Sequence, residues 1–223
     1  MKRLIIIGEG QTEQAFCHDV LKPFFSTKDI FIQNPTIKKS KGGIIDWKDL
    51  KKEISIYLHG DTSAFVTLLI DYYGIHQKHC FPGWDESLRI GNKNDRMDFL
   101  EQAMHNEIDD RFGNRFIPYI QLHEFEGLLF SDRRVFDDNF EDHEFSDYKY
   151  LEETFAQFEN PEMVNDGNKT APSKRLVRII TGYQKPIHGS LLANEIGLTR
   201  IREKCTRFNR WIEKLQLIQQ PFK

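Results

Sequence analysis

The chain opens with a strand pattern that runs directly into a turn and then a helix, and this order constrains the fold more than any other feature. Residues 2–7 begin with two basic residues and continue with large aliphatic ones, which is typical of a strand buried in a sheet. Gly8 and Gly10 flank Glu9 and indicate a tight turn, and Glu13 follows where a helix would just have begun. A strand, a turn and a helix in immediate succession predict an α/β fold.

The same alternation continues through the first part of the chain. Further strands are expected at residues 30–32, 64–70 and 115–122, and helices at residues 11–25, after the capping residue Asp46, and at 98–111. Such alternation favours crossover connections, so we predict a mainly parallel, Rossmann-like sheet flanked by helices. Beyond residue 133 only helices are expected, at residues 149–158, from Pro172 and over 201–215. We therefore predict a core over residues 1–133 and a helical C-terminal part over residues 134–223 packed on it.

Composition narrows the class of protein. The 223 residues suffice for one sizeable α/β domain, and 39% hydrophobic with 29% charged residues is typical of a soluble chain. No apolar run has the length of a membrane span, and the first one is too short for a signal peptide. Three widely spaced cysteines favour a reducing cytoplasm over a disulfide framework. The net charge of −3 gives no global attraction to nucleic acid, so such contact would need a local basic groove.

Acidic residues follow three of the predicted strands. Glu9, Asp71 and either Glu124 or Glu126 stand at strand ends, and the carboxyl ends of parallel strands share one edge of a sheet, where α/β folds bind ligands. Carboxylates gathered there would repel one another unless a cation or protons compensated. Oxygen ligands suit hard cations, so we predict a site for Mg²⁺ or Mn²⁺.

Simpler roles exist for the same acids. Glu9 fits a solvated turn, and Glu13 fits the first turn of a helix, where a negative charge favours the helix dipole. A nucleotide-binding loop is excluded, because residues 8–13 lack the third glycine of a dinucleotide fingerprint and the lysine of a P-loop. If residues 124–126 are extended, Glu124 and Glu126 face the same side, whereas a helix starting at once leaves only one as a ligand.

Several segments resemble a known bacterial family. They are GEGQTE at 8–13, DYYG at 71–74, QLHEFEGLLF at 121–130, PSKR at 172–175, and the spaced residues Gly197, Leu198, Ile201, Arg202, Lys204, Cys205, Phe208, Asn209 and Trp211. These motifs span nearly the whole chain and resemble the bacterial family of unknown function number four-two-seven-six. The strand–Glu–helix and strand–Asp pattern also resembles a Toprim domain, the metal-binding module of topoisomerases, primases and certain nucleases.

The resemblance implies a function. A Toprim-like protein is expected to bind Mg²⁺ or Mn²⁺ and to cleave phosphodiesters in DNA or RNA, with Glu9 and Asp71 as primary ligands. Glu13 and either Glu124 or Glu126 would complete the shell or position water, and Lys174 and Arg175 would steady the charge of the transition state. The resemblance also implies a place in anti-phage defence loci, often beside an ATPase, and so an ATPase partner.

One departure from the Toprim pattern supports an alternative function. Tyr73 replaces the second aspartate of the usual Asp-x-Asp, which puts a two-metal mechanism in doubt, although Glu13, Glu124, Glu126 or Asp132 could compensate. The alternative is a catalytically silent partner or sensor subunit of an ATPase complex. Such a subunit could dock through the aromatic, acidic stretch 136–150, whose rings otherwise simply cover the core.

Three weaker candidates complete the list. His76, His79 and Cys80 share one predicted loop, but a zinc site would need a fourth ligand, and none has suitable spacing. His123 could act as a general base, although a histidine at a strand end is more often structural. The last helix is expected to carry a basic outer face that is either solvated or tracks a nucleic-acid backbone, formed by Arg200, Arg202, Lys204, Arg207 and Arg210.

Overall fold

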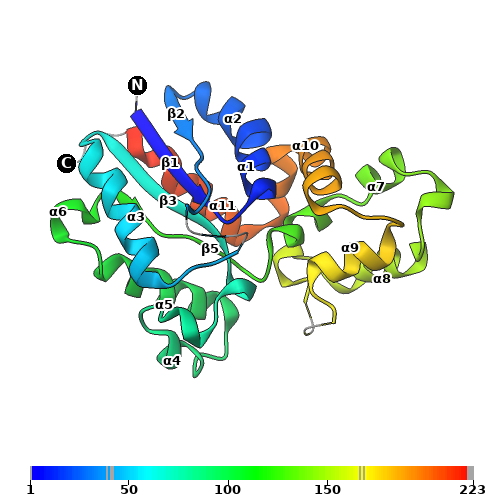
Figure 1. The fold of residues 1–223 in the computed structure, drawn as a ribbon. Helices are drawn as coiled ribbons and strands as arrows, with labels where there is room; N and C mark the ends of the chain where they lie inside the picture. The colour runs from blue at the N-terminus through cyan, green and yellow to red at the C-terminus, as the bar shows by residue number, and fades with distance from the viewer. Residues whose placement is uncertain (1, 39, 41–42, 166, 168, 220–223) are drawn as a thin grey trace.

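A parallel sheet between two layers of helices forms the centre of the protein (Figure 1). The computed structural model describes residues 2–38, 40, 43–165, 167 and 169–219. Its strands are β1 (Lys2–Gly8), β2 (Ile30–Gln33), β3 (Ala64–Asp71), β4 (Phe116–Ile117) and β5 (Ile120–Gln121). They are ordered β2-β1-β3-β4, β5 also pairs with β3, and the pairings are parallel. The predicted α/β fold with a mainly parallel sheet is therefore confirmed.

Helical segments make up most of the remaining chain. The α-helices are α1 (Gln11–Phe16), α2 (Lys22–Ser26), α3 (Trp47–Gly60), α4 (Trp84–Ser87), α5 (Lys93–Asn106), α6 (Asp110–Gly113), α7 (Arg134–Asn139), α8 (Tyr148–Gln157), α9 (Pro172–Ile179), α10 (Lys185–Lys204) and α11 (Thr206–Gln216). The segment η1 (Cys17–Leu21) is a π-helix, and the 3₁₀ segments are η2 (Tyr72–Gly74), η3 (Gln77–His79), η4 (Phe125–Ser131), η5 (Asp142–Glu144), η6 (Pro161–Met163) and η7 (Leu217–Gln219).

Alternating side chains of the central strands supply two hydrophobic cores. Leu4 and Ile6 of β1 face a core that also contains buried residues of α1, α10 and α11, whereas Ile5 and Ile7 face a second core formed with α3 and α5. β3 is buried along its whole length, which explains its continuous apolar sequence. The segments α7, α8 and α9 lie beyond α10 (Figure 1) and extend the first core through residues such as Phe136 and Leu176. The helical C-terminal part expected after residue 133 is thus present.

Prolines explain two differences from the predicted elements. The helix expected at residues 11–25 contains the π-helical turn η1 just before Pro23, which lacks an amide hydrogen and crowds the preceding turn. The strand expected at residues 115–122 is split into β4 and β5 by Pro118, which cannot donate to a ladder. The helix expected at residues 98–111 begins earlier, because the Asn92 side chain accepts hydrogen bonds from the amides of Asn94 and Asp95.

The last helix is also interrupted, at Cys205. The Glu162 carboxylate accepts hydrogen bonds from the amides of Arg207 and Phe208, at 2.8 and 2.9 Å, and so caps the start of α11. The apolar positions still share a buried face on either side of the break, among them Ile201 and Phe208. The face was predicted correctly, but a single continuous helix was wrong.

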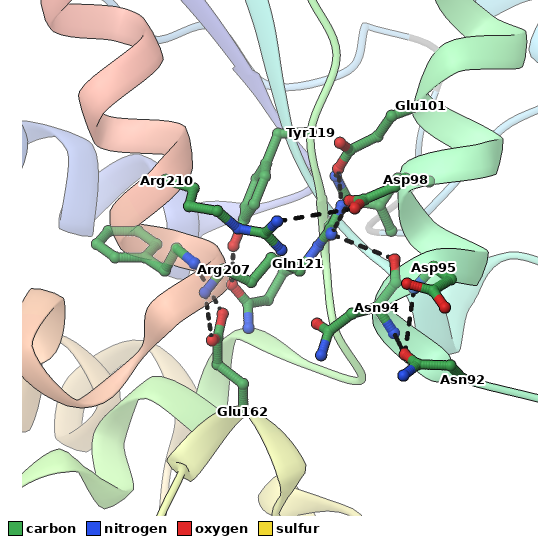
Figure 2. Close-up of polar contacts among 12 residues, drawn as sticks. Asn92, Asn94, Asp95, Asp98, Glu101, Tyr119, Gln121, Glu162, Arg207 and Arg210 are labelled. Atoms are coloured by element: carbon green, nitrogen blue, oxygen red, sulfur yellow. Dashed lines mark hydrogen bonds and ion pairs between the residues drawn. The ribbon is translucent and has the colours of Figure 1, made fainter.

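Arg207 does not lie on a basic outer face, which corrects the expectation for this residue. Its side chain is 3% exposed and pairs with the α5 carboxylates of Asp98 and Glu101 (Figure 2). Its Nε also donates to the carbonyl of Ile120 in β5, at 3.3 Å. Since α5 and α11 cover opposite faces of the sheet, Arg207 joins the two layers around the edge formed by β4 and β5.

The aromatic stretch 136–150 has two of its rings in the interior and most of its other residues at the surface. Phe136 and Phe140 are buried, and their ring centroids lie 6.5 Å apart. Tyr148 is 37% exposed, and its hydroxyl donates a hydrogen bond to Asp137. For Phe136 and Phe140, burial agrees with the alternative that the rings of this stretch cover the core, and it leaves docking through the more exposed rings as a prediction. Among the helices described, none is long and apolar enough to cross a membrane.

Candidate functional site

Four carboxylates gather at the carboxyl end of the central strands. Glu9 follows β1, Asp71 ends β3, Glu13 lies in α1, and Glu126 lies in η4 just after β5. The carboxylates of Glu9, Asp71 and Glu126 share electrostatic interactions with Glu13 or with one another. We call these four residues the acidic edge. The parallel sheet brings them together although they are far apart in sequence.

Glu9 and Asp71 are linked directly. The Oε1 atom of Glu9 accepts a hydrogen bond from the Asp71 amide at 2.8 Å, and Oδ1 of Asp71 accepts one from the Phe125 amide at 2.9 Å. These bonds link the ends of β1 and β3 to the start of η4 and fix the orientation of both side chains. Each carboxylate keeps one oxygen outside these two bonds, and a carboxylate can use such an oxygen to bind a cation.

Glu13 is held by the turn that precedes it. Its Oε2 accepts a hydrogen bond from the Gly10 amide at 2.9 Å, and the side chain is 4% exposed. A Cβ on Gly8 would lie 3.1 Å from the Glu13 Cβ, so the glycine permits this close approach. Neither Gly8 nor Gly10 has a positive φ. The two glycines therefore serve close packing around the carboxylates rather than a left-handed turn.

Glu124 and Glu126 diverge, as expected if a helical segment starts directly after β5. The Glu124 oxygens accept from the Ser173 amide and hydroxyl, at 2.9 and 3.0 Å, which caps α9. Glu126 is fully buried. Its counter-charge is the Lys185 ammonium, whose Nζ lies 3.0 Å from Oε1. Only Glu126 of the two turns into the acidic edge.

Burial and mutual repulsion perturb the ionisation of these groups. Burial raises the pKa of Glu9 to about 7 from an ordinary 4.5, and the Glu13 charge raises it too. Burial and then the Glu9 charge raise the pKa of Asp71 well above its ordinary range. Burial also raises the pKa of Glu126 to about 7, although Lys185 opposes this. For Lys185, burial lowers the pKa, but the charges of Glu126, Asp71 and Glu13 outweigh burial and raise it.

An open pocket of about 600 Å³ adjoins the acidic edge. Glu9, Glu13 and Lys185 line it, together with Ser40 and Gly43 from the loop before α3. The pocket therefore gives access from solvent to Glu9, Glu13 and Lys185, whereas Asp71 and Glu126 do not line it. A second pocket of about 410 Å³ lies at the far side of β4, where the Arg207 ion pairs form its wall. Because Arg207 is already paired with carboxylates there, we assign that pocket a structural role.

The acidic edge fits a cation, but its side chains are not yet arranged as ligands. Within the described ranges, no group of three or more histidine, cysteine, aspartate or glutamate side chains is positioned to hold a metal ion. Glu9 and Asp71 nevertheless each keep one oxygen outside the hydrogen bonds from the Asp71 and Phe125 amides, and burial and repulsion raise the pKa of both carboxyls. Both features favour a positive charge at this edge. Hard divalent cations with oxygen ligands suit it best.

Lys174 and Arg175 are neighbours in sequence, but one is exposed and the other is buried. Lys174 is exposed on the first turn of α9. Arg175 is 2% exposed; its Nε donates to the Thr170 carbonyl at 2.9 Å, and its Nη1 donates to Thr154 Oγ1 at 3.0 Å. Its guanidinium also faces the rings of Tyr150 and Phe158. Arg175 therefore holds the C-terminal part together, which corrects the expectation that it faces the acidic edge.

The histidine candidates have local roles. His79 is 8% exposed, and burial followed by the charge of Lys78 lowers its pKa. Cys80 is an exposed cysteine in the left-handed region, with a φ of 50°. These residues form no metal-binding group in the ranges described. His123, also left-handed with a φ of 66°, lies with Nε2 3.2 Å from Lys93 Nζ and Nδ1 3.2 Å from Asn165 Nδ2.

Lys185 is the residue at this edge that sequence reasoning missed. It begins α10, far along the chain from the strands, within a segment that carries no metal or phosphate motif. Gly189, one turn later, is the signal that could have indicated it. A Cβ there would lie 3.4 Å from Thr12 Cγ2 and 3.3 Å from the Tyr183 hydroxyl, so the glycine lets α10 pack closely on α1. This packing brings Lys185 to the carboxylates.

Comparison with known proteins identifies the family of the chain. No curated protein and no solved structure matches it. A profile described as a domain of unknown function, DUF4276, matches residues 8–216, a range that includes the acidic edge and Lys185. The match confirms the family resemblance of the sequence motifs, while the likeness to Toprim domains and to defence loci stays a prediction. The chain belongs to the DUF4276 family of proteins.

Proposed function

We propose that this protein is a Toprim-like, divalent-metal-dependent nuclease that hydrolyses phosphodiesters in nucleic acid. The observation that supports the proposal is the set of four carboxylates at the ends of parallel strands, beside a pocket of about 600 Å³. Buried acids with strongly raised pKa values in a cleft are a recognised mark of a functional site. Nucleic-acid hydrolysis also needs a positive charge to receive the phosphate, and divalent cations provide it.

The residues of the acidic edge have separate roles in this proposal. Glu9 and Asp71 hold Mg²⁺ or Mn²⁺, and Glu13 orients the attacking water or completes the ligands. A divalent ion held by these carboxylates would supply Lewis acidity, polarising a phosphoryl oxygen and lowering the pKa of a water molecule. The hydrogen bonds from the Asp71 and Phe125 amides keep the carboxylates of Glu9 and Asp71 in place before the ion arrives, which lowers the reorganisation needed at the reaction.

The net charge of the chain suggests that it needs a partner to act on nucleic acid. A net charge of −3 gives weak long-range attraction to DNA or RNA, so we expect slow turnover by the isolated protein. We propose an ATPase as the partner that delivers the nucleic acid, within bacterial defence. The second candidate is a catalytically silent partner or sensor subunit of such an ATPase. It is favoured by the finding that the carboxylates are not arranged as a ligand set in the part of the chain described.

A cleavage assay separates the two functions. Single- and double-stranded DNA and RNA are incubated with wild type, Glu9→Gln and the exposed control Glu195→Gln. Each reaction is run in Mn²⁺, in Mg²⁺ and in EDTA, with and without the proposed ATPase partner. The nuclease proposal predicts metal-dependent cleavage by wild type and the control and a loss of at least a hundredfold in Glu9→Gln. Absence of cleavage with both metals and with the ATPase would reject the nuclease and favour the silent subunit.

A further inference from the structure

Lys185 pairs with one member of the acidic edge, Glu126, while Glu9 and Asp71 are joined to each other. On one side, Glu9 is hydrogen-bonded to the Asp71 amide, and both Glu9 oxygens lie 3.5 Å from the position that a Cβ on Gly74 would take. On the other side, Glu126 faces the Lys185 ammonium at 3.0 Å. The charges that raise the pKa of Lys185 act in the order Glu126, Asp71 and Glu13. The ammonium therefore belongs most closely to Glu126 and lies toward the other carboxylates.

Burial makes the pairing between Lys185 and Glu126 unusual. Glu126 has no exposed surface, whereas 41% of the Lys185 side chain is exposed in the pocket. A fully buried carboxylate is strongly destabilised unless a cation stays beside it. The Lys185 ammonium is positioned as that cation. Its exposed part still reaches the pocket in which a substrate would lie.

From this arrangement, and resting on the proposed function, we infer that the acidic edge is a mixed cation site. One divalent ion binds at Glu9, Asp71 and Glu13, and the Lys185 ammonium, anchored on Glu126, holds the position that a second divalent ion would otherwise take. Lys185 is then positioned to contact the phosphate of the bound nucleic acid. Glu126 pairs with the Lys185 ammonium and does not bind the metal ion.

Electrostatics explain why one metal ion and the ammonium exclude a second metal ion. When ionised, the four carboxylates and Lys185 leave an excess of three negative charges, and one divalent ion offsets two of them. A second divalent ion at Glu126 would lie within a few ångströms of the ammonium, where like charges repel strongly in a partly buried site. Removing the ammonium, by contrast, leaves Glu126 buried and unpaired and so creates a vacancy for a cation.

The number of bound Mn²⁺ ions tests this inference without measuring activity. Mn²⁺ is titrated into wild type, Lys185→Met, Lys185→Arg and the exposed control Lys174→Met, with calorimetry and the electron paramagnetic resonance of free Mn²⁺ as readouts. We expect one ion per chain in wild type, Lys185→Arg and Lys174→Met, and two in Lys185→Met. In the double variant Lys185→Met with Glu126→Gln, the second ion is expected to be lost again.

The possible outcomes separate this inference from the proposed function. One ion in Lys185→Met with unchanged affinity, or two ions in wild type, would overturn the mixed site while leaving a metal-dependent nuclease intact. Absence of Mn²⁺ binding in every variant would reject both. If Lys185→Met does not fold without metal, Lys185→Gln is titrated instead, because its amide keeps a polar group beside Glu126 without the positive charge. The same two-ion result is expected of it.

Discussion

Replacing Glu9 with glutamine is expected to stabilise the metal-free protein at pH 8. Glutamine keeps an oxygen that accepts the hydrogen bond from the Asp71 amide, at 2.8 Å in wild type, but carries no charge. Burial and the Glu13 charge hold the pKa of Glu9 near 7 in the fold, against an ordinary 4.5 in the unfolded chain. The folded state therefore binds more protons between these values, so stability falls as pH rises from about 4.5 to 7.

The size of the effect follows from the two pKa values. A carboxyl whose pKa is about 7 instead of 4.5 removes about 3 kcal/mol of folding stability once the pH exceeds 7. Glu9→Gln avoids most of this loss. For a chain of this length, 1 kcal/mol shifts the unfolding temperature by about 2–4 °C, so we expect a rise of about 6–12 °C at pH 8. Below pH 4.5 the carboxyl is protonated in both states, and the difference should vanish.

Thermal unfolding in EDTA at pH 4, 6 and 8 measures the effect. Glu195→Gln, which removes an exposed glutamate of α10, is the control and should match wild type within about 0.5 kcal/mol at each pH. Equal or lower stability of Glu9→Gln at pH 8, or the same gain at pH 4 as at pH 8, would refute the argument that buried, repelling carboxylates destabilise the metal-free fold.

Two further substitutions test the structural roles of buried arginines. Arg207→Met leaves the Glu101 carboxylate buried without its counter-charge and should lower stability by about 3–5 kcal/mol, measured by chemical denaturation. A loss below about 1 kcal/mol would contradict the role of Arg207 in joining the two helical layers. Arg175→Met removes hydrogen bonds to the C-terminal part and should cost about 2 kcal/mol, whereas Lys174→Met should stay within about 0.5 kcal/mol; equal effects of the two would contradict their assignment to interior and surface.

Local sequence patterns predicted the core of the fold well. Continuous apolar runs identified β1 and β3, and the acids directly after them were placed at the carboxyl edge, because strand ends in a parallel sheet share one side. Errors arose where a single residue overrides a pattern. Pro118 divides one predicted strand into two, and Glu162, distant in sequence, caps a second helix after Cys205. The proline was visible in the sequence, but the cap depends on tertiary contact.

Charged residues were predicted less well than apolar ones. Arg207 and Arg175 resemble surface residues by type, yet each is buried because carboxylates, hydroxyls or rings from other elements surround it. Lys185 was missed because its partner, Glu126, is supplied by a different part of the chain. A helical pattern shows which positions face inward, but it does not show which charges lie opposite. Such pairs become visible only once the elements are packed.

A Mn²⁺ titration of wild type, Glu9→Gln and Asp71→Asn tests the central claim most directly. The claim is that Glu9 and Asp71 share one divalent ion at the acidic edge. Calorimetry at pH 7.5 should give a saturable site in wild type that is at least tenfold weaker or lost in each variant, because each substitution removes a charged ligand while retaining the local hydrogen bonds. Equal affinity for Mn²⁺ in all three proteins would contradict a shared site.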